Sequence, residues 1–119
     1  MATGKPIVIY GIKNCDTMKK ARVWLDGRRV PYAFHDYREK GVDRPRLKDW
    51  VKRVGWERLL NRSSATFREL PEAAREGITE AKAIDLMLAQ PTMIKRPVLD
   101  LGDRLLVGFK PETYEAEVG

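Results

Sequence analysis

The sequence predicts an α/β domain in which a four-stranded mixed sheet carries a helical insertion over about residues 41–90. Three observations predict this fold class. An apolar run, a helix-like stretch and a second β-rich run follow one another near the start of the chain. The middle of the chain has apolar residues at helical spacing, and the last third returns to two β-rich runs around a turn. The expected order is therefore strand, helix, strand, several helices, strand, strand and helix.

The first third of the chain is expected to form a β-α-β unit. Residues 7–10 are nearly all apolar, as in a central strand that is buried on both faces. A helix is expected over 16–28, because three apolar residues recur on one face at helical spacing, Met18, Ala21 and Leu25. A second strand is expected over 32–37, and the short connection predicts a parallel, right-handed unit.

The middle segment is expected to be an insertion made of helices. Asp43 is expected to cap a helix that Gly55 ends, and apolar residues lie three and four positions apart between them. Short helical turns are expected at 56–61 and 71–76, and a longer helix is expected at 79–90.

The last third is expected to return to the sheet. Strands are expected at 97–101 and 104–107, because they flank Gly102 and Asp103, a pair that is typical of two-residue hairpin turns. A final helix is expected at 111–117, with a proline in its first turn. Without the insertion, this order of elements is that of a thioredoxin-like domain of the glutaredoxin type.

Composition narrows the class of protein. The 119 residues, of which 43% are hydrophobic, suit one folded domain over 1–119. No apolar run is long enough for a signal peptide or a membrane span, and a single cysteine favours the reducing cytoplasm. The net charge of +6 suits small anions or acidic partners, but acidic residues are interspersed, so nucleic-acid binding is not expected. One histidine and one cysteine are too few for a zinc site, so no bound metal is expected.

The strongest candidate for chemistry is Cys15. It directly precedes the first expected helix, where unpaired N–H groups and the helix dipole favour a thiolate. The N–H groups of this turn, which contains Asn14, Asp16 and Thr17, are also expected to hold an anion. Lys13 adds positive charge whereas Asp16 opposes a thiolate, so the residues leave the direction of the pKa shift open. The alternative is a buried structural cysteine.

The chain itself supplies no second thiol. Where thioredoxins carry a second cysteine, this sequence has Met18. A dithiol mechanism is therefore excluded, and if Cys15 reacts, the second thiol must come from another molecule.

Several cations and the only histidine are further candidates. Pro97 precedes the third strand, and in a thioredoxin-like fold this proline is typically cis and places its neighbour, Arg96, beside the thiol. Arg96 would then offer two donors to an oxyanion; the alternative is a surface arginine before a strand. Arg62 suits either an anion site or a helix C-terminus, and Lys110 is a weaker candidate. His35 either tunes the thiolate or is a hydrogen-bonded strand histidine.

Taken together, these landmarks resemble the ArsC/Spx family, which comprises glutaredoxin-coupled arsenate reductases, Spx regulators and YffB-like proteins. The resemblance runs through nearly the whole chain, and the CDTMKKA segment with the context of His35 is closest to the YffB-like branch. The matching stretches are IVIYGIKNCDTMKKARVWL, YAFHDYREKG, LLNRSSATFREL, AIDLMLAQPTMIKRPVLDLG and LLVGFKPETY.

The resemblance implies a thioredoxin-like fold and an arsenate-reductase-like cycle in which Cys15 attacks an oxyanion or a glutathione disulfide. Glutathione would be the co-substrate, with no bound cofactor, and glutaredoxin or more glutathione would resolve the product. Arg96 matches the family arginine that holds the oxyanion. At two other positions where the family has an arginine, this chain has a different residue. Asn61 occupies the first, with Arg62 next to it, and Lys110 occupies the second.

Two other functions follow from the same resemblance. The first is a non-catalytic, Spx-like regulator that binds RNA polymerase, although the pair of cysteines common in that branch is absent here. The second is an inactive relative that only binds glutathione.

Overall fold

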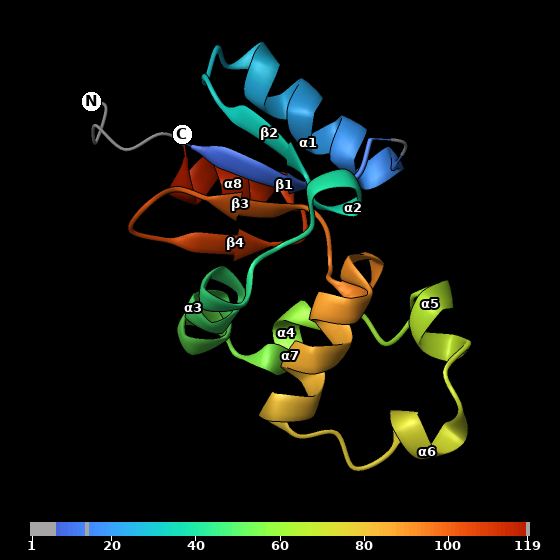
Figure 1. Ribbon diagram of the computed structural model, residues 1–119. Helices are drawn as coiled ribbons and strands as arrows, with labels where there is room; N and C mark the ends of the chain where they lie inside the picture. Colours follow the sequence, from blue (N-terminus) through green and yellow to red (C-terminus); the bar gives the residue numbers. More distant parts are fainter. Residues whose placement is uncertain (1–6, 14, 119) are drawn as a thin grey trace. The chain divides into compact units, whose positions relative to one another are not determined.

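Four strands form one mixed sheet in the order β2-β1-β3-β4 in the computed structural model, which describes residues 7–13 and 15–118 (Figure 1). Strand β1 (Val8–Gly11) pairs in parallel with β2 (Ala33–Asp36) and antiparallel with β3 (Val98–Asp100). Strand β4 (Leu105–Val107) pairs antiparallel with β3. The predicted four-stranded mixed sheet and its thioredoxin-like order are confirmed.

The second strand is shorter than predicted. The sequence predicts a strand over 32–37, but Tyr37 begins a helical turn, α2 (Tyr37–Lys40). The physical reason is the buried Tyr37 side chain, whose hydroxyl donates a hydrogen bond of 2.8 Å to the carbonyl of Ile94. This hydrogen bond holds Tyr37 in the helical turn rather than in the strand. The prediction that the strand extends to 37 was therefore wrong.

The hairpin between β3 and β4 turns at the predicted residues. The N–H of Leu101 donates to the carbonyl of Arg104 at 2.9 Å, which leaves Gly102 and Asp103 as the two turn residues. Gly102 has a φ of 93°, a conformation that other residues rarely adopt. The strands are shorter than the predicted 97–101 and 104–107, since regular pairing stops one residue before the turn.

Two helices cover one face of the sheet. Helix α1 (Asp16–Gly27) and helix α8 (Pro111–Glu117) pack their apolar sides on the central strands. The aromatic rings of Trp24 and Tyr114 meet edge to face, with centroids 5.4 Å apart, and so join the two helices. The buried side chains of this core are Ile9, Met18, Ala21, Leu25, Leu99, Leu101 and Tyr114.

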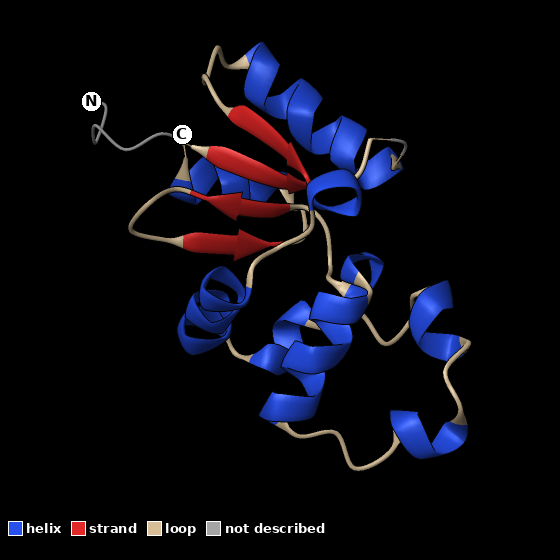
Figure 2. Cartoon of the chain, viewed as in Figure 1, coloured by secondary structure: helices blue, strands red, loops and turns tan. Residues whose placement is uncertain are grey.

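The chain divides into two compact units. The first contains the sheet and is built from 1–36 and 96–119, and the second spans 37–95 and contains the predicted insertion. That 1–119 form a single domain stays a prediction. The named elements of the second unit are all helices, joined by loops, as Figure 2 shows by colour. Its elements after α2 are α3 (Arg44–Val54), α4 (Trp56–Leu59), α5 (Ala65–Arg68), α6 (Glu72–Arg75), α7 (Glu80–Ala89) and the 3-10 turn η1 (Pro91–Met93).

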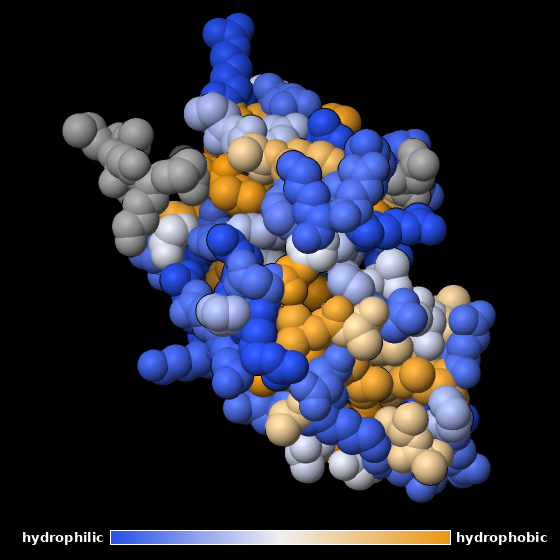
Figure 3. Space-filling model, in the orientation of Figure 1, coloured by the Kyte–Doolittle hydropathy of each residue, from blue (hydrophilic) through white to orange (hydrophobic). Residues whose placement is uncertain are grey.

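The longer helices of the second unit begin and end where their caps predict. The Asp43 side chain accepts a hydrogen bond of 2.8 Å from the N–H of Arg46, and Gly55, with a φ of 89°, follows the last residue of α3. Thr79 caps α7 by accepting from the N–H of Lys82. Apolar side chains gather among these helices on the face that Figure 3 shows.

The described residues contain no helix that is both long and apolar enough to cross a membrane.

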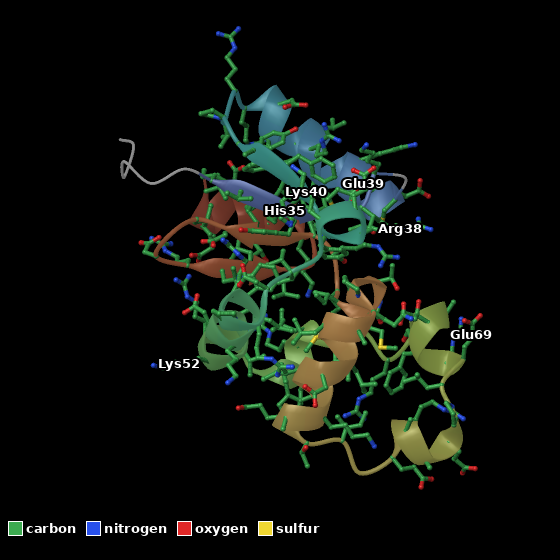
Figure 4. The ribbon with its side chains drawn as sticks, in the orientation of Figure 1. His35, Arg38, Glu39, Lys40, Lys52 and Glu69 are labelled. Carbon is green, nitrogen blue, oxygen red and sulfur yellow. The ribbon has the colours of Figure 1, made fainter. Side chains whose placement is uncertain are left out.

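The charged residues of α3 occupy an exposed face. Arg53 pairs with Asp49 one turn earlier at 3.1 Å, and Lys52 projects outward from the helix (Figure 4). This face of α3 is therefore a solvent-exposed helix surface.

Candidate functional site

Cys15 lies at the N-terminus of α1, as the sequence predicts. Its φ of −129° and ψ of 127° are extended, so it is the N-cap residue that precedes the first helical turn. Its carbonyl accepts a hydrogen bond of 3.0 Å from the N–H of Lys19, and its side chain is partly buried. The side chain is thus neither fully buried, as a buried structural cysteine would be, nor fully exposed.

Arg96 lies beside the thiol. Its Nε donates a hydrogen bond of 3.4 Å to the Sγ of Cys15. The peptide bond between Arg96 and Pro97 is cis, and β3 begins at the next residue, Val98. Since Val98 pairs with Tyr10 near the end of β1, the sheet itself brings the arginine to the strand–helix turn. The two geometric expectations for this pair, a cis proline and an arginine beside the thiol, are confirmed.

Arg96 and main-chain N–H groups act on the pKa of Cys15 in the same direction. Burial raises the pKa, but the N–H groups of Met18 and Thr17, together with the hydrogen bond and charge of Arg96, outweigh it and lower the pKa below its ordinary value. The sulfur makes no side-chain capping hydrogen bond of regular geometry to the helix. The direction that the residues alone left open is therefore downward, toward the thiolate.

The structure describes three of the other predicted residues around the turn, Lys13, Asp16 and Thr17. Asp16 is the first residue of α1, and Thr17 follows it with the N–H that helps to lower the pKa of Cys15. Lys13 lies in the connection after β1. Asn14 lies outside the described residues. A role of these residues in holding a substrate stays a prediction.

The two remaining cations lie in different units. Lys110 is the exposed N-cap residue of α8, in the unit that contains the sheet. Arg62 belongs to the helical unit, where its guanidinium lies 5.4 Å from the centre of the Trp56 ring, a cation–π contact. The structure thus brings Cys15 and Arg96 together, whereas anion binding by Arg62 and Lys110 stays a prediction.

His35 lies in the middle of β2, directly across from Tyr10 of β1 (Figure 4). The centroids of the two rings are 4.8 Å apart with a tilt of 47°. This packing agrees with the simpler expectation of a strand histidine, and tuning of the thiolate stays a prediction. Among the described residues, no group of three His, Cys, Asp or Glu side chains is arranged to hold a metal ion.

The sequence analysis did not single out Gly11 as part of the site. A β-carbon at Gly11 would lie 2.2 Å from the Sδ of Met18, so any other residue there would require the Met18 side chain to shift. A glycine at a strand end is a known signal of close approach by another group, but nothing in the sequence says that this group is Met18.

The fold and the site together define a thioredoxin-like protein with a single cysteine at a helix N-terminus, beside an arginine and a cis proline. Residues 10–117 match the model of the ArsC family, so this chain belongs to the ArsC family. The resemblance identified from the motifs is thereby confirmed.

Known relatives cover nearly the whole chain. An uncharacterized protein of Haemophilus influenzae is 38% identical over 110 residues, which are 92% of this chain and 96% of the relative. The global transcriptional regulator Spx 1 of Lactococcus lactis is 24% identical over 112 residues, which are 92% of this chain and 87% of that protein.

Two solved structures are more similar still. A protein named YffB is 59% identical with a TM-score of 0.92, and the match covers 95% of this chain and 99% of that one. An arsenate reductase (ArsC) related protein from Brucella melitensis is 53% identical with a TM-score of 0.77, over 98% of both chains.

Proposed function

We propose that this protein is a glutathione-dependent thiol oxidoreductase in which Cys15 is the nucleophile. The observation that carries the proposal is the 3.4 Å hydrogen bond from the Nε of Arg96 to the Sγ of Cys15 at a helix N-terminus. A thiolate is the reactive form of cysteine, and both the arginine and the helix favour it. The membership of the ArsC family and the similarity to an arsenate reductase related protein support the same class of reaction.

With a disulfide substrate, the reaction proceeds by thiol–disulfide exchange. The Cys15 thiolate attacks one sulfur of oxidised glutathione, a mixed disulfide forms, and one glutathione thiolate leaves. A second thiol, from glutathione or glutaredoxin, then attacks the glutathione sulfur of the mixed disulfide and restores the Cys15 thiolate. The external thiol is required because Cys15 is the only cysteine of the chain.

With arsenate, the same thiol supplies one of the two electrons of the reduction. Cys15 and one glutathione are oxidised together to a mixed disulfide, while arsenate is reduced to arsenite and one oxygen leaves as water. Arg96 would hold the oxyanion through donors that match its geometry. Lys110 would contribute charge without that bidentate geometry, which favours disulfide exchange at least as much as arsenate reduction.

The proposed setting is the reducing cytoplasm, where glutathione is abundant and a single thiol stays reduced. Glutathione would act as a co-substrate rather than a bound cofactor, and the partners would be glutaredoxin and a small oxyanion or disulfide.

Mass spectrometry of Cys15 after incubation with oxidised glutathione tests the proposal. We expect a glutathione adduct on Cys15 that is lost on adding glutathione with glutaredoxin, and none in Cys15→Ser. An arsenate-reduction assay with both thiols then separates the two substrates. A mixed disulfide without arsenite production assigns the protein to disulfide exchange, whereas a wild-type protein that forms no adduct and produces no arsenite refutes the proposal.

A regulatory function is the second candidate, because several relatives are named as global transcriptional regulators Spx. In this function the chain would bind RNA polymerase and Cys15 would not turn over. Purified RNA polymerase that binds the wild type and Cys15→Ser with equal affinity, with no thiol turnover, would favour this candidate over the enzyme.

A further inference from the structure

Gly11 and Met18 approach each other unusually closely on either side of the Cys15 turn. Gly11 is the last residue of β1, and Met18 lies in the first turn of α1. A β-carbon at Gly11 would lie 2.2 Å from the Sδ of Met18 and 2.7 Å from its Cε. The methionine side chain therefore fills the space that any other residue at position 11 would need.

The Met18 side chain has little room to move away. It is 1% exposed and packs within the core that also contains Ala21, Leu25 and Leu99. A methionine is flexible, but its far end can swing only by displacing these neighbours, because protein cores are closely packed. The side chain is thus held between the end of β1 and the core of the sheet.

Fixing the Met18 side chain also fixes its main chain. As the third residue of α1, Met18 carries one of the N–H groups that have no partner within the helix. Cys15, the N-cap residue, lies three positions earlier, and the N–H of Met18 is one of the groups that act on its sulfur. A shift of the Met18 side chain would therefore also shift an N–H group that acts on the sulfur.

We propose that Met18 is a positioning residue for Cys15: its buried side chain, seated against Gly11, holds the first turn of α1 so that its N–H groups face the sulfur. The inference rests on the proposed function only in taking Cys15 as the reacting group. It gives Met18 a role of its own, beyond occupying the place of a second cysteine.

The electrostatics of the thiol agree with this geometry. Burial raises the pKa of Cys15, and the N–H of Met18, the Arg96 hydrogen bond and charge, and the N–H of Thr17 lower it. Arg96 reaches the sulfur from the start of β3, a separate element, whereas Asp16 is the acidic residue of the first turn. Substitutions at Gly11 and Met18 thus test the helix contribution separately from the arginine.

The rate of Cys15 alkylation by iodoacetamide, measured against pH, tests the proposal without glutathione. We expect Met18→Ala and Gly11→Ala each to slow alkylation about threefold or more below the thiol pKa, as a rise of about half a pKa unit would do. We expect the double variant to be no slower than Met18→Ala, because alanine removes the atoms with which the new β-carbon collides.

Two controls separate positioning from loss of stability. Gly27→Ala, at the other end of the same helix, places its β-carbon where no atom lies within 4 Å, and should leave the alkylation profile unchanged. Leu25→Ala removes an equally buried side chain of the same core and should lower the unfolding temperature without shifting the profile.

The inference is overturned if folded Met18→Ala alkylates with the wild-type profile, or if Leu25→Ala shifts the profile as much. It is also overturned if Gly11→Ala slows alkylation equally with and without Met18→Ala. Should Gly11→Ala not fold, the comparison of Met18→Ala with Leu25→Ala decides alone. A wild type that forms no glutathione adduct and produces no arsenite would refute the proposed function but leave this inference standing.

Discussion

The Nε of Arg96 lies 3.4 Å from the sulfur of Cys15, although 81 positions separate the two residues in the sequence. The antiparallel pairing of β1 with β3 bridges this separation, because Tyr10 pairs with Val98. The pKa of the thiol is therefore lowered by a residue that the sheet brings to it as well as by the local helix start. This relationship leads to the first two predictions.

Arg96→Ala is expected to raise the pKa of Cys15, because it removes both a hydrogen bond to the sulfur and a positive charge. Arg96→Lys should raise it less, since a charge remains but the Nε donor is lost. The pH dependence of Cys15 alkylation measures both. Arg104→Ala is the control: this arginine pairs with Glu117, and its loss should leave the thiol unchanged. Equal profiles for the wild type and Arg96→Ala would contradict the role of the contact.

The stability of the protein is expected to rise with pH through the range in which Cys15 ionises. The folded pKa is lowered, so the folded state loses its thiol proton before the unfolded chain, whose thiol has a pKa of about 8.5. By linkage, this contribution is fully present above the unfolded pKa and is lost as pH falls through the folded pKa. The unfolding temperature of the wild type minus that of Cys15→Ser, measured from about pH 6 to pH 10, should therefore increase with pH. A difference that stays flat or falls would show that the folded pKa is not lowered.

Tyr37→Phe is expected to destabilise the protein by about 1–3 kcal/mol. The substitution removes the buried hydrogen bond of 2.8 Å to the carbonyl of Ile94 and leaves that acceptor unsatisfied. Urea unfolding measures the change. Tyr32→Phe removes a hydroxyl that accepts a partly buried bond from Arg22 and should change stability by less than about 0.5 kcal/mol. Equal losses in the two variants would argue against a special role of the Tyr37 hydroxyl.

Asp43→Ala is expected to cost about 1 kcal/mol, because it removes the side-chain cap that accepts from the N–H of Arg46. Asp49→Ala, in the same helix, removes an exposed ion pair with Arg53 and should cost only about 0.3–0.5 kcal/mol. Chemical denaturation of both variants compares them directly. The interpretation of Asp43 as a cap fails if the order of the two losses is reversed.

Much of the fold could be predicted because its signals are local. Apolar spacing and capping residues located α1, α3 and α7, and the Gly102–Asp103 pair located the hairpin. Of the four-residue helices, α4 and α6 fall within the predicted turns at 56–61 and 71–76. The sequence analysis predicted no helix at α2 or α5, because a single turn shows no apolar period. Ser64 caps α5 by accepting from the N–H of Phe67, but this bond is visible only once the chain is folded.

The site could be predicted only in part. The position of Cys15 at a helix start follows from the order of its neighbours, but its contact with Arg96 depends on pairing between distant strands. The direction of the pKa shift needed the structure, because burial and hydrogen bonding act against each other at the sulfur. The contact of Met18 with Gly11 depends on one side-chain conformation, which no residue pattern specifies.

The sheet-containing unit is assembled from the two ends of the chain, with the helical unit between them. A ribosome releases the N-terminal end first, so a growing chain displays Cys15 long before Arg96 has been made. During this interval the nascent thiol lacks its arginine, and it gains that partner only when β3 joins β1. The share of the lowered Cys15 pKa that comes from Arg96 is therefore a property of the folded sheet, whereas the share from the helix start needs only the first elements of the chain.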